Sequence, residues 1–339
     1  MRTLLALLAG IVFTATSLLA QGAKVSSPAE LARLADQLKP GEWVWAPDVA
    51  PEGPVLIYVD LSRQLATVYR NGVRIGVTTI SSGKEGHETP TGVFTILQKD
   101  ADHHSNIYNN APMYYQERLT WGGVALHAGG LPGYPESHGC IHLPYTFSQE
   151  LFKITHLGIT VVVQGNAASH ITDTSAGLLA PMNAQGVAVT EEPLTNEQFR
   201  WQPDLSPTGP LTIIISKSDQ RIVVLRNGIE IGRSLVQIDE TDTGSHVITY
   251  SVGKDGVPHW IYVGLPGHAD DSGRLLDANT LSRVHMPRTF YEDLHAAITP
   301  GTTILVTQSS VGTDTTGQKL TIIDAVSPTM PATPAKPTT

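Results

Sequence analysis

The chain has 339 residues, of which 41% are hydrophobic and only 16% are charged. That composition supports a folded core and argues against an intrinsically disordered protein. Asp and Glu number 31 against 22 Lys and Arg, a formal net charge of -9, so nucleic acid and anionic membrane surfaces are disfavoured as partners. At about 100–200 residues per domain, the length predicts two domains.

The N-terminal segment has the pattern of an export signal. Arg2 precedes an apolar stretch from Leu4 to Ala20, and small residues continue to Ala23. Residues 1–23 are therefore predicted to be a signal peptide, which places the mature protein in the periplasm or elsewhere in the cell envelope. The alternative is a retained anchor, because the stretch is marginally long enough to span a membrane. Contact with the membrane would then be made only through this segment.

The next segments predict one short helix followed by strands. Ser27 and Glu30 have the spacing of a capping box, and the helix should end at Pro40, within a lead-in of residues 24–53. From Pro54 onward, short apolar runs alternate with turn residues, as in a mainly β fold. The predicted strands are 55–59, 65–69, 73–80, 93–97, 122–127 and 159–163, with a tight turn at Asn71-Gly72 and a short helix at 147–154.

A second copy of this pattern follows. Residues 54–76 match residues 210–232 without a gap, and the segment after His142 resembles the segment after His285. In that alignment Arg283 takes the place of Cys140. The prediction is two tandem β-rich domains with short helices. Their boundaries are 54–165 for the first domain, 166–208 for a linker, 209–307 for the second domain, and 308–339 for a C-terminal segment that ends in a Pro/Thr-rich tail.

The chemistry-bearing segment surrounds the only cysteine. Cys140 lies between His138 and His142, and a Gly-rich loop separates it from His127 at the end of a predicted strand. A cysteine nucleophile needs a base or cation, exposure, and donors for an oxyanion, and this segment can supply all three. Two alternatives stay open. The thiol can be an inert buried side chain, or it can bind zinc with these histidines, although their spacing does not follow the common paired-ligand patterns. No metal or organic cofactor is predicted.

At this point the sequence resembles a known family. The run Ser137-His138-Gly139-Cys140, preceded by His127, resembles the signature of bacterial L,D-transpeptidases with a YkuD-type catalytic domain. The segment 87–96 and the turn Asn71-Gly72 also look like that family. The likeness covers residues 54–163 and is partial over 210–306. The fold it implies is two tandem YkuD-like domains, the second of them degenerate.

The resemblance implies a role for each motif residue. Cys140 matches the nucleophile, and His127 matches the histidine that takes the thiol proton. His138 and Gly139 match the residues that shape the loop and the oxyanion site, and Ser137 matches the first position of the motif. Such enzymes attack a peptidoglycan stem tetrapeptide, release D-Ala and form a thioester. An amine from another stem, or from an envelope lipoprotein, then resolves the thioester.

Further expectations concern the walls of the site. The family commonly has Arg or Asn two residues after the cysteine, where this chain has His142, so substrate contacts or loop geometry should differ there. Tyr115 and Trp121 are candidates for a donor groove, alongside Ser137 and His142. The adjacent pair at 103–104 lies in a polar stretch and is expected to face solvent. His127 is expected to sustain a thiolate, so activity should rise with pH near the histidine range.

Two rival functions share these residues. Water can replace the acceptor amine, which would make the protein an L,D-carboxypeptidase or a crosslink-cleaving endopeptidase. Alternatively, the chain can be a non-catalytic cell-wall binding protein, a role open to the second copy because it lacks the cysteine.

Overall fold

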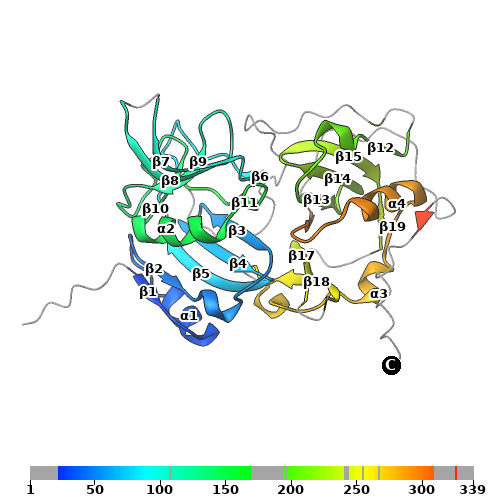
Figure 1. Ribbon diagram of the computed structural model, residues 1–339, viewed down its shortest axis with the longest axis horizontal. Coiled ribbons are helices and arrows are strands. Elements are labelled where there is room, and N and C mark those ends of the chain that lie inside the picture. Colours follow the sequence, from blue (N-terminus) through cyan, green and yellow to red (C-terminus); the bar gives the residue numbers. More distant parts are fainter. Residues whose placement is uncertain are drawn as a thin grey trace, which may run out of the picture.

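The computed structural model describes residues 22–106, 109–168, 194, 197–239, 244–253, 256–265, 268–308 and 325–326. In this part the chain forms two β-rich units, coloured blue to green and yellow-green to orange in Figure 1. Residues 1–21 of the predicted signal peptide lie outside the described residues. No helix in the described part is long and apolar enough to cross a membrane.

The first unit contains two sheets and a helix between them. Its seven-stranded sheet has the order β1-β2-β5-β4-β3-β11-β6, and its four-stranded sheet has the order β10-β9-β8-β7. The large sheet consists of β1 (Gly22–Lys24), β2 (Trp43–Trp45), β3 (Val55–Asp60), β4 (Leu65–Arg70), β5 (Val73–Thr79), β6 (Gly92–Thr95) and β11 (Thr160–Gln164). The small sheet consists of β7 (Gln98–His104), β8 (Pro112–Arg118), β9 (Ala125–Ala128) and β10 (Ile141–Leu143). The hairpin β7–β8 was not expected from the sequence, because its strands are polar and only partly buried.

Local sequence signals explain several element ends. Ser27 Oγ accepts a hydrogen bond from Glu30 N at 3.2 Å, so the predicted capped start of the helix is confirmed in α1 (Pro28–Ala35). The helix ends at Ala35, before the expected end at Pro40. Asn71 and Gly72 both have positive φ, 51° and 77°, which fits the predicted tight turn between β4 and β5. The predicted second helix is confirmed as α2 (Tyr145–Ile154), beginning two residues earlier than expected.

The second unit repeats the order of six strands of the large sheet, from β2 to β6; β1 has no counterpart, and β18 is additional. Its seven-stranded sheet runs β12-β15-β14-β13-β20-β17-β18, and a small sheet runs β16-β19-β21. The strands are β12 (Phe199–Trp201), β13 (Leu211–Ser216), β14 (Arg221–Arg226), β15 (Ile229–Leu235), β16 (Gln237–Ile238), β17 (His246–Val252), β18 (Pro258–Val263), β19 (Val284–Pro287), β20 (Thr303–Thr307) and β21 (Ala325–Val326). The helices are α3 (Ala278–Leu281) and α4 (Arg288–Ala297), with 3₁₀ turns η2 (Pro203–Leu205) and η3 (Ala269–Asp271). The first unit contains the 3₁₀ turn η1 (Pro47–Val49).

The two units correspond in register as well as in order. In each large sheet the strand that follows helix α2 or α4 pairs in parallel with the first strand of the repeat, β11 with β3 and β20 with β13. His142 pairs antiparallel with Ser81, and His285 pairs antiparallel with Gln237. These pairings agree with the internal sequence match. Strand β12 and turn η2 lie within the segment assigned to the linker, so this unit begins before residue 209.

Both faces of the first sheet are buried. On β3, Ile57 and Val59 face the core that includes Phe147 of α2, whereas Leu56 and Tyr58 face the other way, as the two-residue period of a strand requires. The second face packs against the corresponding sheet of the second unit. This shared cluster consists of Leu56, Tyr58, Tyr69, Val93, Val162, Ile214, Val223, Leu225, Val247, Val263, Leu265 and Leu305. The units are therefore joined through an apolar sheet-to-sheet contact.

Candidate active site

The topology brings the motif histidine and the cysteine to one cavity. Strand β10 pairs in parallel with β9, placing His142 opposite His127, and Cys140 directly precedes β10. Cys140 and His127 both line a cavity of about 810 Å³. The thiol and the strand-ending imidazole therefore border the same cavity.

Ser137 and Gly139 shape the turn that presents the thiol. Ser137 Oγ donates to Cys140 O at 2.6 Å and accepts from Gly139 N at 3.1 Å. Gly139 has a φ of +108°, a conformation that residues with a side chain rarely adopt. Because Gly139 N–H is committed to Ser137, it is not available for an oxyanion. The Cys140 N–H has no hydrogen-bond partner among the described residues.

A second segment, which the sequence did not mark as part of the site, anchors this turn. Thr89 Oγ1 donates to Gly139 O at 3.0 Å and accepts from Gly83 N at 2.8 Å. Ser82 O accepts the N–H groups of Glu136 and Ser137. The only sequence signal for this role was the family-like run 87–96, which contains Thr89.

His127 is held as a neutral imidazole. Its Nδ1 lies 2.8 Å from Ala128 O, so Nδ1 carries the proton and Nε2 is the basic nitrogen. The side chain is 5% exposed. Burial lowers the pKa of His127 to about 4, with a further lowering from His142. At neutral pH it can accept a proton but does not supply a positive charge.

The cysteine is held as a thiol. Burial raises the pKa of Cys140, and the opposing contributions of the Ala125 N–H and the Arg118 guanidinium are smaller. Its Sγ donates to Gly123 O at 3.3 Å. Desolvation therefore opposes the expected resting thiolate, because it favours the neutral form of both groups. The arrangement fits a neutral pair in which the base removes the proton during attack.

His142 and His138 occupy different environments. The His142 ring lies 4.8 Å from the His127 ring, centroid to centroid, and its Nδ1 lies 3.2 Å from Gly130 O. It therefore packs beside the base at the cavity wall. His138 is exposed at the rim, with its ring 4.7 Å from that of His87.

Of the two aromatic residues predicted to line the site, Trp121 does so and Tyr115 does not. Trp121 lines the cavity and is 54% exposed, with the Arg118 guanidinium 5.7 Å from its ring. Tyr115 does not line the cavity. Its hydroxyl accepts from Gln149 Nε2 at 3.1 Å and its ring packs on Phe152, because the side-chain period of β8 turns it toward α2.

Additional cavity residues come from the unpredicted hairpin and from α2. They are His103, His104, Met113, Tyr114, Gln116, Arg118 and Tyr145. His103 and His104 were expected simply to face solvent, but they border the site because β7 pairs with β8. Nothing in the sequence indicated this position, because the pairing of β7 with β8 is what brings the two histidines to the cavity.

A buried carboxyl lies behind the cavity wall. Glu117 is 1% exposed, accepts a short hydrogen bond from Thr155 Oγ1 and lies 3.9 Å from Lys99 Nζ. Burial raises the pKa of Glu117 to about 7, against the opposing effects of Thr155 and Lys99. Since the folded state holds this proton more tightly than the unfolded state, Glu117 costs stability as the pH rises from 4.5 through 7.

Replacing Glu117 with Gln should therefore raise the free energy of unfolding at pH ~8 by about 2 kcal/mol. The gain should vanish near pH ~3.5, below the unfolded-state pKa of 4.5, where Glu117 is protonated in both states. Urea unfolding at both pH values measures the difference. Glu150→Gln is the control, because Glu150 is partly exposed and ion-paired with Lys24. A gain in Glu117→Gln that is the same at both pH values would contradict the prediction.

Comparison with known proteins finds similarity in the first unit. Residues 54–163 match the family model of the YkuD L,D-transpeptidase catalytic domain. No curated protein matches the chain. Among solved structures, an L,D-transpeptidase from Stackebrandtia nassauensis is 30% identical, with 34% of this chain and 58% of that chain covered and a TM-score of 0.32. One from Mycobacterium smegmatis is 26% identical (32% and 58% covered, TM-score 0.31).

A third, from Enterococcus faecium, is 29% identical (34% and 51% covered, TM-score 0.29). The chain thus spans little more than half the length of these relatives. The family match is confined to the unit that contains Cys140 and His127. Residues 54–163 therefore carry the match to the YkuD L,D-transpeptidase catalytic domain.

Proposed function

We propose that this protein is a cysteine L,D-transpeptidase that acts on peptidoglycan stem peptides through a thioester on Cys140. The observation that carries the proposal is the placement of Cys140 and the neutral base His127 on one cavity, inside the matched domain. An exported, periplasmic location is part of the proposal, because its substrate lies in the cell wall.

The proposed chemistry has two half-reactions. His127 Nε2 takes the proton from Cys140 as sulfur attacks the carbonyl before the terminal D-Ala. The Cys140 N–H donates to the developing oxyanion. The C–N bond then breaks, and D-Ala leaves with the proton that His127 returns. An acceptor amine attacks the thioester in the second half-reaction, His127 takes its proton, and the thiol is regenerated.

The cavity walls bear on substrate binding. Trp121 offers an exposed aromatic surface at the rim, and Arg118 offers a guanidinium suited to a substrate carboxylate. His142, which stands where the family commonly has Arg or Asn, packs against the base. We assign it a positioning role for His127. Ser137 and Gly139 act through the turn that presents the thiol.

The deciding experiment is product analysis with purified stem tetrapeptide and a donor–acceptor mixture. Transfer yields a new crosslinked dimer together with free D-Ala. Trimmed stems without dimer would replace the proposal by an L,D-carboxypeptidase, and separated stems from a crosslinked substrate would replace it by an endopeptidase. If neither product forms and Cys140 gains no acyl adduct in the mass spectrum, the proposal is replaced by a non-catalytic cell-wall binding protein.

Gly139→Ala tests the turn. An added Cβ would meet nothing closer than 3.8 Å, so the expected damage comes from the φ of +108° rather than from a clash. We expect acylation of Cys140 to slow by at least ~10-fold, corresponding to strain of 1–3 kcal/mol. Rates of adduct formation by mass spectrometry measure this. Gly86→Ala is the matched control, with a φ of +78° and open space around it. Equal rates in the two variants would contradict the assigned role.

The second unit has a separate role in this proposal. Its sheet has the strand order of the catalytic unit, but Arg283 aligns with the cysteine. We propose that it is a degenerate copy that supports the catalytic unit through the shared apolar cluster.

A further inference from the structure

A group of potential metal ligands lies in the second unit, away from Cys140. His246 begins β17, His268 follows β18, and Asp271 ends η3. One ligand atom from each lies within 4.8 Å of the others. In the portion of the chain that the structure describes, no other trio of His, Cys, Asp or Glu side chains meets this criterion.

The carboxylate of this group is buried and its two oxygens have different partners. Asp271 is 8% exposed. Its Oδ1 accepts from the Arg274 guanidinium at 2.7 Å, and its Oδ2 lies 2.7 Å from His246 Nδ1. Arg274 thus fixes the rotamer and occupies one oxygen, so that the other is directed at the imidazoles. Burial would raise the pKa of Asp271, but the hydrogen bonds from Arg274 and His246 outweigh it and keep the carboxylate ionised.

The position of His268 is the observation that points to metal binding. A hydrogen bond to Asp271 accounts for the position of His246, but not for His268, whose ring lies 4.8 Å from that of His246. Two imidazoles and a carboxylate with convergent ligand atoms are a donor set of transition-metal sites, and of zinc in particular. Arg274 supports the group from outside, because it holds the carboxylate while its guanidinium carbon lies 4.0 Å from the centre of the Tyr262 ring.

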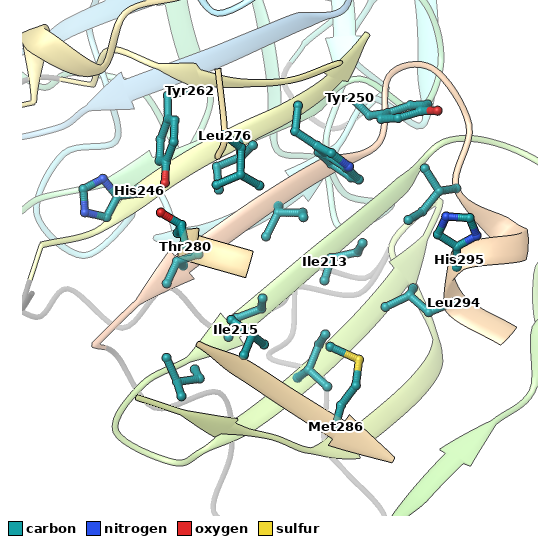
Figure 2. A pocket seen from close by; sticks show the side chains of 18 of the residues that line it. Ile213, Ile215, His246, Tyr250, Tyr262, Leu276, Thr280, Met286, Leu294 and His295 are labelled. Carbon is teal, nitrogen blue, oxygen red and sulfur yellow. The ribbon is translucent and has the colours of Figure 1, made fainter. Parts of the chain in front are cut away.

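Of the trio, His246 alone lines a neighbouring apolar cavity. His246 and Tyr262 lie together at one end of an apolar cavity of about 310 Å³, and His295 lies at the other end (Figure 2). The cavity wall between them is formed by aliphatic side chains such as Ile213, Leu276 and Leu294. A cation at such a place needs ligands from the protein, which the trio provides.

We propose that His246, His268 and Asp271 bind one divalent transition-metal ion of the zinc class. With bonds of about 2.0–2.2 Å, neighbouring ligand atoms lie about 3.3–3.6 Å apart, so His246 and Asp271 need to separate by less than ~1 Å. The hydrogen bond between them is lost, and the proton of His246 Nδ1 shifts to Nε2. Three protein ligands leave a fourth position for water.

The site would also affect how the units are joined. The loop that carries His268 and Asp271 continues to Ser272, whose hydroxyl lies 3.4 Å from Gly72 O in the first unit. Gly273 approaches Val73, 3.7 Å from the position of an added Cβ. A bound ion would hold this loop against the β4–β5 hairpin, so zinc should stabilise the two-unit protein without taking part in the proposed reaction.

Equilibrium dialysis of the full chain, purified without a histidine tag, against ZnCl₂ tests the proposal. We expect one zinc ion per chain in the wild type, and at least ~10-fold weaker binding in His268→Ala and in Asp271→Asn. His295→Ala is the matched control and should bind zinc like the wild type. Cys140→Ala should also bind zinc normally, which separates this site from a zinc–thiolate site in the first unit.

A thermal unfolding series distinguishes variants that have lost a zinc ligand from variants that fold poorly. Zinc should raise the unfolding midpoint of the wild type and of His295→Ala but not that of His268→Ala, whose midpoint without zinc should equal that of the wild type. No zinc in the wild type, retention of zinc by His268→Ala, or loss of zinc in Cys140→Ala would each overturn the proposal.

Discussion

Cys140→Ala should abolish acyl-enzyme formation, lowering turnover of a stem tetrapeptide by at least ~10³-fold, as for other nucleophile deletions. The thiol is the only one in the chain, so no second sulfur can take over. The loss should appear in two readouts: the rate of D-Ala release and the mass adduct on the intact protein. Unchanged release of D-Ala by the variant would refute the assignment of the nucleophile.

Cys140→Ser separates chemistry from folding. Serine keeps the hydrogen-bonding capacity toward Gly123 O that the thiol uses, so the loop should stay intact, with an unfolding midpoint close to that of the wild type. A hydroxyl is a much weaker nucleophile beside a neutral imidazole. We therefore expect an inactive variant that still binds substrate, as measured by calorimetry with the tetrapeptide.

His127→Gln should lower the acylation rate by ~10²–10⁴-fold, the usual contribution of a general base. The wild-type rate should also be nearly independent of pH through the range in which an ordinary histidine titrates. The active form has a neutral His127, whose pKa is lowered to about 4. The acid limb should therefore lie near pH 4 and not near pH 6.5. The rate of D-Ala release across pH ~4–8 measures it.

Alkylation of the free enzyme tests independently whether Cys140 and His127 are both neutral. The pKa of Cys140 is raised from 9.0 by burial, so iodoacetamide should react slowly near neutral pH and faster as the pH rises. The rate at pH ~7 should be about the same in His127→Gln, because no ion pair is lost. Fast alkylation of the wild type near neutral pH, abolished in His127→Gln, would instead indicate a preformed thiolate–imidazolium pair.

Features that depend on neighbours in the chain were predictable from the sequence. Ser27 caps its helix because the amide it binds is three residues away, and Asn71-Gly72 forms its turn because both residues tolerate positive φ. The repeat was also visible, since matching turns and apolar runs produced sheets of the same strand order. Within the site, the run Ser137-His138-Gly139-Cys140 was singled out by its resemblance to a family motif, and in the structure it forms one tight turn.

The protonation states and the surroundings of the site were decided by tertiary structure alone. His127 and Cys140 are neutral because residues far away in the chain exclude water from them, and desolvation has no local sequence signature. Thr89 joins the site across 50 residues, and Tyr115 leaves it because of the face of β8 on which it falls. His246, His268 and Asp271 likewise meet only after β17 and β18 pair. Sequence patterns specify turns, periods and motifs, whereas burial and convergence of side chains arise only when distant strands are brought together.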